Sequence, residues 1–324
     1  MANLFDIGKS GLQAYRQSLA VTGQNIANID TDGYKRREAG LQEISAGTGR
    51  VTGIQNQTGI GVRVTDIRRS FDEFLLNKAR SATANAEAKE AHYANVKQLE
   101  DILLPGDANL GTSIGQFFSS LQEIVTAPSD LAPRVVALEQ GKLLADSFND
   151  VAAVVQQLKD GIITQANQEI DSINLLANEL GTLNQQIASA GVNKVNNALL
   201  DRRDALIDEI SESVGVSVSL GSSGAANLTI GDSGRGPVLV EGNKVTPMGI
   251  DPEYTLISFV MSPGVANIYT SQVTKGALAG LADGYATVAS VMNDIDHLAY
   301  TLVQDMNAIH KAGLDMDGLP GKNI

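Results

Sequence analysis

The distribution of proline constrains the fold of this chain more than any other feature of its sequence. All eight prolines lie at or beyond Pro105, and four of them fall between Pro237 and Pro263. Neither the first 104 residues nor the segment 134–236 contains one. Because proline removes a backbone donor and clashes with the preceding helical turn, its absence permits long helices in both segments.

Hydrophobic periodicity and helix-breaking residues predict helices over 4–28, 71–104, 113–126, 133–190, 197–214 and 277–312. Gly33, in TDGY, can take the positive φ that ends a helix or closes a turn. Ser129 or Asp130 is suited to cap the long helix that follows. That helix contains apolar residues at alternating steps of three and four, as in the seam of a coiled coil or bundle: Ile173, Leu176, Leu180, Leu183, Ile187 and Ala190.

Two segments have the pattern of strands. Residues 40–69 are rich in Gly and Thr and predict an extended loop with one or two edge strands. Residues 216–270 contain VSVSL, NLTI, PVLV and TLISFV between Gly- and Pro-rich turns, which predicts a small antiparallel β unit. We therefore expect a mainly α fold, an elongated helical bundle or coiled coil with an N-terminal amphipathic helix and a small β insertion. The expected domains are 1–70, then 71–214 together with 271–324, and the insertion 215–270.

The first predicted helix has a narrow apolar stripe that repeats every seven residues, formed by Phe5, Leu12, Leu19 and Ile26. The opposite face is Lys, Arg, Gln and Asn. A helix with so narrow a stripe cannot enclose a core and needs a partner helix. Assembly with other subunits is one interpretation, and packing within the chain against the helix that starts at Phe71 is the alternative.

Charge is unevenly distributed along the chain. The net charge is −13, yet residues 33–80 contain nine Lys or Arg and five Asp or Glu. The overall acidity argues against general nucleic-acid binding, which requires cations to displace phosphate counterions. The basic segment could meet RNA, an anionic membrane or acidic neighbouring subunits, or it could be a solvated loop.

Composition and the absence of targeting signals argue against cysteine-dependent sites, signal-peptide export and membrane spans. There is no Cys, which removes disulfides, thiolate metal sites and Cys nucleophiles, and aromatic residues make up only 4% of the chain. The N-terminus lacks the basic and apolar regions of a secretory signal peptide, so we expect any export to use another route. No run approaches the roughly 20 apolar residues of a membrane span.

Two D-x-D-G runs resemble the start of a calcium loop. Beginning at Asn28, the loop would use Asp30, Asp32 and Gly33, but its twelfth position is Ala39 instead of the bidentate Glu. The second run, in 313–324, ends in Ile324 and lacks the same ligand. We interpret both as turns and expect no metal site.

No catalytic pattern emerges. His92 stands alone, and His297 and His310 miss the i, i+4 spacing of a helical metal pair. The Gly-rich run 221–236 is not a phosphate-binding loop, and Ser233 does not match the nucleophile-elbow motif. We expect neither an enzyme nor a cofactor.

The stretch NIANIDTDGYKRRE follows an amphipathic helix and resembles the signature of bacterial flagellar axial proteins, which are the rod, hook and hook-associated subunits. Further stretches narrow the resemblance to the flagellar hook-associated protein 1 (FlgK) family. The likeness covers nearly the whole chain and is most specific in NAIHKAGLDMDG and in the block that contains Leu200, Arg203, Asp204, Leu206 and Ile210. The other matching stretches are FDEFLLNKARSATANAEAKEAHYANVKQLEDIL, FFSSLQEIVTAPSDLAPRVVALEQGKLLADSFN and INLLANELGTLNQQIA.

The resemblance implies a structural subunit, extracellular and exported by the flagellar type III apparatus without a cleaved signal peptide. Its copies form a ring that joins the hook to a second hook-associated junction protein and transmits torque. An export chaperone would bind through the family's C-terminal region, and neither nucleic-acid binding nor membrane insertion is implied. The N-terminal helix and the basic loop would supply the subunit interface: Phe5, Leu12, Tyr15, Leu19, Ile26, Asn28, Gly33, Tyr34, Lys35 and Arg36.

Some alternatives remain open at this level. Family members continue past the position of Ile324 to a second amphipathic helix that pairs with the first, so we expect this sequence to lack that C-terminal region. Lys35 in DGYKR also resembles hook and rod subunits, although the long helical block over 71–214 argues against them. A secreted coiled-coil adhesin that binds a ligand through the β insertion is a further alternative, and an enzyme is the most distant.

Overall fold

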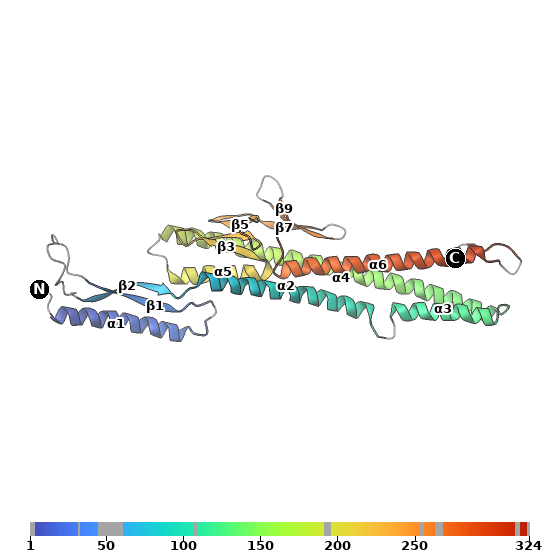
Figure 1. The fold of residues 1–324 in the computed structure, drawn as a ribbon, viewed down its shortest axis with the longest axis horizontal. Coiled ribbons are helices and arrows are strands. Elements are labelled where there is room, and N and C mark those ends of the chain that lie inside the picture. The colour runs from blue at the N-terminus through green and yellow to red at the C-terminus, as the bar shows by residue number, and fades with distance from the viewer. Residues whose placement is uncertain are drawn as a thin grey trace.

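The fold is elongated, with helices along its length, the strands of the insertion on one side of the long helices, and β1 and β2 at one end beside α1 (Figure 1). The computed structural model describes residues 4–31, 33–44, 61–106, 109–190, 196–252, 256–262, 268–314 and 318–322. The helices in these ranges are α1 (Leu4–Ala27), α2 (Glu73–Leu103), α3 (Leu110–Thr126), α4 (Leu131–Ala190), α5 (Asn197–Ser213) and α6 (Ala277–Ala312). The predicted mainly α class with a β insertion is confirmed.

Side-chain caps fix where α3 and α4 begin. Helix α3 begins earlier than predicted, at Leu110, because the side-chain oxygen of Asn109 accepts a hydrogen bond from the amide of Thr112 at 2.9 Å. The carboxylate of Asp130 accepts from the amide of Ala132 at 3.1 Å, as the sequence predicted for the start of α4. Both caps satisfy amides that the first helical turn leaves without a partner.

The long helix α4 organises the core. Its 60 residues extend for about 90 Å at 1.5 Å per residue. Helices α2, α5 and α6 pack along it, and α6 crosses α2 so closely that a Cβ built on Gly280 would lie 2.1 Å from the carbonyl oxygen of Ala88. Burial of large aliphatic side chains drives this packing. Fully buried examples are Ile162, Ile173, Leu180, Ile187, Leu206, Ile207, Ile210 and Leu278.

The β insertion consists of two antiparallel sheets instead of the single unit that the sequence predicts. One sheet has the order β3-β4-β5-β6 and the other the order β7-β8-β9. Strands β6, β7 and β9 escaped sequence analysis because they are short or, as in MGIDP, contain residues that disfavour strands. The strands are β3 (Val216–Leu220), β4 (Ala226–Ile230), β5 (Val238–Glu241), β6 (Lys244–Val245), β7 (Met248–Pro252), β8 (Ile257–Met261) and β9 (Ile268–Thr270).

Two asparagines of α4 attach the sheets to the helix. Asn184 accepts from the amide of Ala226 and donates to the carbonyls of Ala226 and Gly242, each at 2.8 Å. Asn174 accepts from the amide of Met248 at 2.8 Å and donates to its carbonyl at 2.9 Å. A side-chain amide carries both a donor and an acceptor, so it can bind a strand's backbone in both directions.

The N-terminal residues form a separate layer at the end of the molecule opposite α3 (Figure 1). Helix α1 packs against an antiparallel hairpin of β1 (Arg37–Glu43) and β2 (Val62–Arg69), which confirms the strands expected here. We call α1, β1 and β2 the terminal unit, and α2–α6 with the two sheets the helical body. Among the described residues, no side chain of the terminal unit belongs to the main hydrophobic core, which draws all its members from the helical body.

Candidate assembly surface and its attachment to the helical body

Helix α1 buries its small side chains and exposes its large ones. Ala14 and Val21 are 3% and 4% exposed and lie on the face that packs on the hairpin. The predicted interface side chains Phe5, Leu12, Tyr15, Leu19 and Ile26 are instead between 64% and 76% exposed. This is the reverse of an ordinary amphipathic helix, in which the large apolar residues face the core. We call Phe5, Leu12, Leu19 and Ile26 the outer stripe.

The outer stripe is not covered by α2, the partner that packing within the chain would require. The exposure of Leu12, Leu19 and Ile26 is that of residues in solvent, and α2 runs into the helical body, away from α1 (Figure 1). Exposed apolar side chains aligned on one face indicate a surface that another molecule covers.

The remaining predicted interface residues lie in the turn after α1. Gly33 has a φ of 73°, the left-handed conformation that glycine adopts without strain. Asn28, Tyr34 and Lys35 are partly buried, whereas Arg36 is exposed and pairs with Glu38.

An open groove of about 650 Å³ runs between α1 and the segment 34–39. It brings together three predicted residues, Ile26, Tyr34 and Arg36, from both sides of the turn. The predicted residues near the N-terminal end of α1 do not line it.

Asn25 fixes this turn, and sequence analysis missed it. Its side-chain oxygen accepts from the amide of Arg37 at 2.9 Å and from the Tyr34 hydroxyl at 2.9 Å, while its nitrogen donates to the carbonyl of Arg37 at 2.8 Å. The Arg37 guanidinium also lies over the Tyr34 ring, 4.9 Å from its centroid. These contacts fasten the end of α1 to the start of β1.

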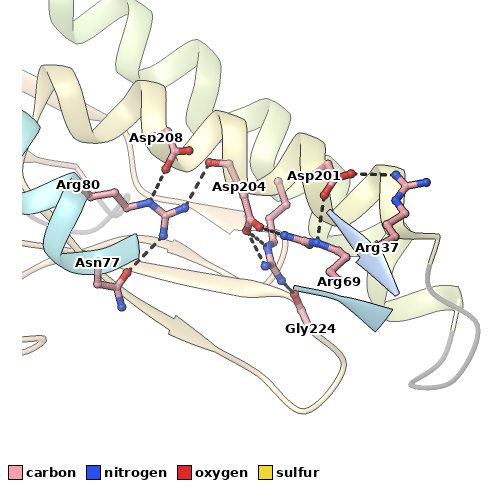
Figure 2. A network of polar contacts seen from close by, with 9 residues as sticks. Arg37, Arg69, Asn77, Arg80, Asp201, Asp204, Asp208 and Gly224 are labelled. Carbon is pink, nitrogen blue, oxygen red and sulfur yellow. Dashed lines mark hydrogen bonds and ion pairs between the residues drawn. The ribbon is translucent and has the colours of Figure 1, made fainter. Parts of the chain in front are cut away.

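A cluster of ion pairs joins the terminal unit to the first turns of α5 (Figure 2). Arg37 of β1 donates to Asp201 at 2.9 Å, and Arg69 of β2 lies 3.0 Å from the other oxygen of the same carboxylate. Arg69 also pairs with Asp204. The side chains of Arg69 and Asp204 are 6% and 2% exposed, so these charges are withdrawn from water and depend on one another. We call this cluster of Arg37, Arg69, Asp201 and Asp204 the joint.

Two shorter contacts complete the attachment. The Asn197 side-chain amide donates to the carbonyl of Ile67 at 3.0 Å. A Cβ built on Gly33 would lie 3.4 Å from that of Ala205, so the turn after α1 approaches α5 closely.

The ion-pair network continues inside the helical body. Arg203 donates to Asp204 at 2.6 Å and also binds the carbonyl of Gly224. One turn further along α5, Asp208 accepts from Arg80 of α2 at 2.5 Å. Arg203 and Asp204 belong to the block in which the family resemblance is most specific. Their side chains form polar contacts that connect α5 with the β insertion and with the terminal unit.

Neither a metal-holding group nor a membrane-spanning helix occurs among the described residues. Within the described ranges, His, Asp and Glu do not gather into a group that could hold a metal ion. Of the two calcium-loop resemblances, Asp32 of the first and residues 315–317 and 323–324 of the second lie outside these ranges. No helix in the described part of the chain has the length and hydrophobicity to cross a membrane.

Two family models match different parts of the chain. Residues 96–324 match the model of the flagellar hook-associated protein FlgK helical domain, and residues 5–35 match that of the flagella basal body rod protein. The whole chain aligns with flagellar hook-associated protein 1 of Escherichia coli (27% identity, 60% of that protein) and of Salmonella typhimurium (28%, 59%). The Bacillus subtilis protein of that name is 25% identical over 98% of this chain and 68% of its own length.

A solved structure supports the same conclusion. The flagellar hook junction protein FlgK from Burkholderia pseudomallei superimposes with a TM-score of 0.69 and 25% identity, over 76% of this chain and 46% of that one. The chain spans about 60% of the length of its Escherichia coli and Salmonella relatives. With the helical-domain match extending over residues 96–324, the chain belongs to the flagellar hook-associated protein FlgK family.

Proposed function

We propose that this chain is a structural subunit of the bacterial flagellum that joins the hook to the filament as part of a ring of copies. The observation that carries the proposal is that α1 buries small apolar side chains and leaves the large ones of its outer stripe in solvent. Such a stripe suits a tubular wall in which neighbouring copies cover it. Tyr15 lies on the same helix and extends this surface.

The second part of the interface is the turn and basic segment after α1. Tyr34 and Arg36 line the groove, and together with Asn28, Gly33 and Lys35 they would contact acidic surfaces of adjacent subunits. The rest of the chain is strongly acidic, which favours attraction between the basic segment of one copy and the body of the next.

The mechanism is mechanical coupling, without catalysis. Contacts repeated around the ring would transmit torque from a flexible hook to a stiffer filament, while the packed helical body carries the load within each copy. The proposed partners are further copies of the chain, the hook protein, a second hook-associated junction protein and, through the family's C-terminal region, an export chaperone. The proposed location is the extracellular hook–filament junction, reached through the flagellar type III export apparatus.

A hook or rod subunit is the second candidate, since the rod-protein model matches residues 5–35. That match covers the terminal helix and the turn after it. The helical-domain match, which covers the greater part of the chain, favours the junction subunit.

Charge introduced into the outer stripe tests the proposal. The double change Leu12→Glu and Leu19→Glu, made in the protein in its own host, is expected to leave the helical body folded and to abolish incorporation into isolated flagella and motility. The matched control, Gln17→Glu with Gln24→Glu, adds the same charge to the same helix away from the stripe and is expected to assemble. Normal incorporation of the stripe variant, or unfolding of the whole chain, would reject the assembly role of α1.

A further inference from the structure

The attachment of the terminal unit differs in kind from the packing of α2, α5, α6 and the sheets on α4. Helices α2, α4, α5 and α6 and the two sheets share one hydrophobic core, to which the described residues of α1, β1, β2 and α3 contribute no side chain. Among the described residues, the contacts at the boundary with the body include the ion pairs of the joint, the hydrogen bond from Asn197 and the approach of Gly33 to Ala205. The covalent connection is the short segment Ser70–Asp72, between β2 and α2.

Buried ion pairs often contribute little net free energy to stability. The desolvation of both charges offsets most of their attraction, so a set of such pairs fixes an orientation at a small net gain in free energy. Apolar packing would make any other orientation costly in proportion to the area exposed. A boundary made of ion pairs can therefore open at low cost when its charges regain water.

The joint also leaves few uncompensated charges when it opens. Asp204 accepts from Arg203 within the helical body, so it retains a cation after Arg69 has moved away. The Asp201 side chain is 13% exposed, and its buried oxygen, which faces Arg69, gains access to water when the terminal unit moves away. Its oxygen facing Arg69 Nε has no hydrogen bond, and neither has that nitrogen, so this contact is a charge pair alone.

From these observations we propose that the joint is an electrostatic latch. Arg37 and Arg69 hold the terminal unit against α5 in the orientation of Figure 2, and opening of their pairs with Asp201 and Asp204 lets that unit turn as a rigid body about Ser70–Asp72. The block that contains Arg203 and Asp204 thus has a role that helix formation does not explain. It forms the fixed half of the latch, which sets the angle between the outer stripe and the helical body.

Distance measurement between two spin labels tests the latch directly, because the chain has no Cys. Labels are placed at Gln13→Cys on α1 and Gln186→Cys on α4, both exposed, and the distances are measured by pulsed electron–electron double resonance. With the joint unsubstituted, the distance between the two labels is expected to have one narrow distribution. Arg69→Met is expected to shift part of the population to other distances and to broaden it.

The chain offers a matched control in the adjacent residue. Arg68 pairs with Asp66 of its own strand and is largely exposed, so Arg68→Met is expected to leave the distribution unchanged. Asp201→Asn is the second test variant, since it removes the carboxylate that Arg37 and Arg69 share and is expected to broaden the distribution as Arg69→Met does.

Circular dichroism of each variant separates orientation from folding. Unchanged helix content with a broadened distribution supports the latch. A distribution in both test variants as narrow as in the unsubstituted protein overturns it. Loss of helix content in both variants also overturns it, because the ion pairs would then hold the fold of the body and not the orientation of the terminal unit.

Discussion

The helical body and the terminal unit are stabilised in opposite ways. The body buries large aliphatic side chains from four helices and two sheets in one continuous core. The terminal unit buries Ala14 and Val21 beneath α1 and exposes the large residues of its outer stripe. The first arrangement is self-sufficient, and the second gains its apolar burial only when another molecule covers it. The difference separates a region whose apolar side chains are buried within the chain from a region that leaves its large apolar side chains exposed, as the proposed assembly role requires.

The largest contrast is expected from removing apolar side chains. Leu206 of α5 is fully buried, so Leu206→Ala is expected to lower the free energy of unfolding by about 2–5 kcal/mol. Leu19→Ala, on the outer stripe, is expected to change it by no more than about 0.5 kcal/mol in the isolated chain. Urea denaturation followed by circular dichroism measures both. An equal loss in the two variants would contradict the division between the regions.

A smaller effect is expected where α6 crosses α2. A Cβ at Gly280 would lie 2.1 Å from the carbonyl oxygen of Ala88, a backbone atom that cannot move aside. We expect Gly280→Ala to destabilise the body by about 1–3 kcal/mol. Gly161→Ala, in open space on α4, is the control and is expected to stabilise it by about 0.5–1 kcal/mol. Thermal unfolding distinguishes the two, and a stabilising Gly280→Ala would show that the crossing is looser than described.

Two asparagines with the same role permit a direct comparison between the regions. Asn184 is buried, and Asn184→Ala would leave the backbone groups of β4 without partners, at a cost of about 1–3 kcal/mol of global stability. Asn25 is half-buried at the end of α1, where water can replace it. Asn25→Ala is expected to increase local amide exchange near Arg37 and leave global unfolding unchanged. Global destabilisation by Asn25→Ala would mean that the terminal unit unfolds together with the body.

The smallest effect is expected from an exposed pair on the hairpin. The Arg68 guanidinium donates to Asp66 at 2.6 Å and holds the pKa of that carboxyl below its usual value, with a further hydrogen bond from Thr65. Because the folded-state pKa is depressed, the pair's stabilisation is present above the unfolded pKa and is lost as the pH falls through the folded value. Arg68→Gln is expected to raise the pKa of Asp66, measured by NMR titration. An unchanged pKa would show that the pair does not form in solution.

The sequence predicted the body better than the joint, for a physical reason. Helix periodicity is a local signal, so α4 and its seam are visible in the order of residues such as Ile173 and Leu180. The stripe of α1 is equally local, and its need for a partner follows from its width. The pairing of Arg37 with Asp201 spans 164 residues, and charge alone does not show which of the many carboxylates an arginine meets.

Sequence analysis did not predict the hydrogen bonds from side chains to distant backbone groups, for a related reason. Asn25, Asn174 and Asn184 each bind backbone groups of another segment, and nothing in their neighbours along the chain distinguishes them from exposed asparagines. In the second sheet, β8 overlaps the predicted stretch TLISFV, whereas β7 and β9 were missed because they are short or contain residues that disfavour strands. The sequence reveals what repeats along a helix or strand, whereas single side chains that join distant segments require the structure.

Amide hydrogen exchange on the isolated chain tests the central claim most directly. The buried segments of α4, α5 and α6 are expected to exchange only on global unfolding, whereas α1, with its large apolar face in water, is expected to exchange much faster through local opening. That result would show that the terminal unit depends on neighbouring subunits for its full stability. Protection of α1 equal to that of the body would contradict the account, because α1 would then have all the packing it needs within one chain.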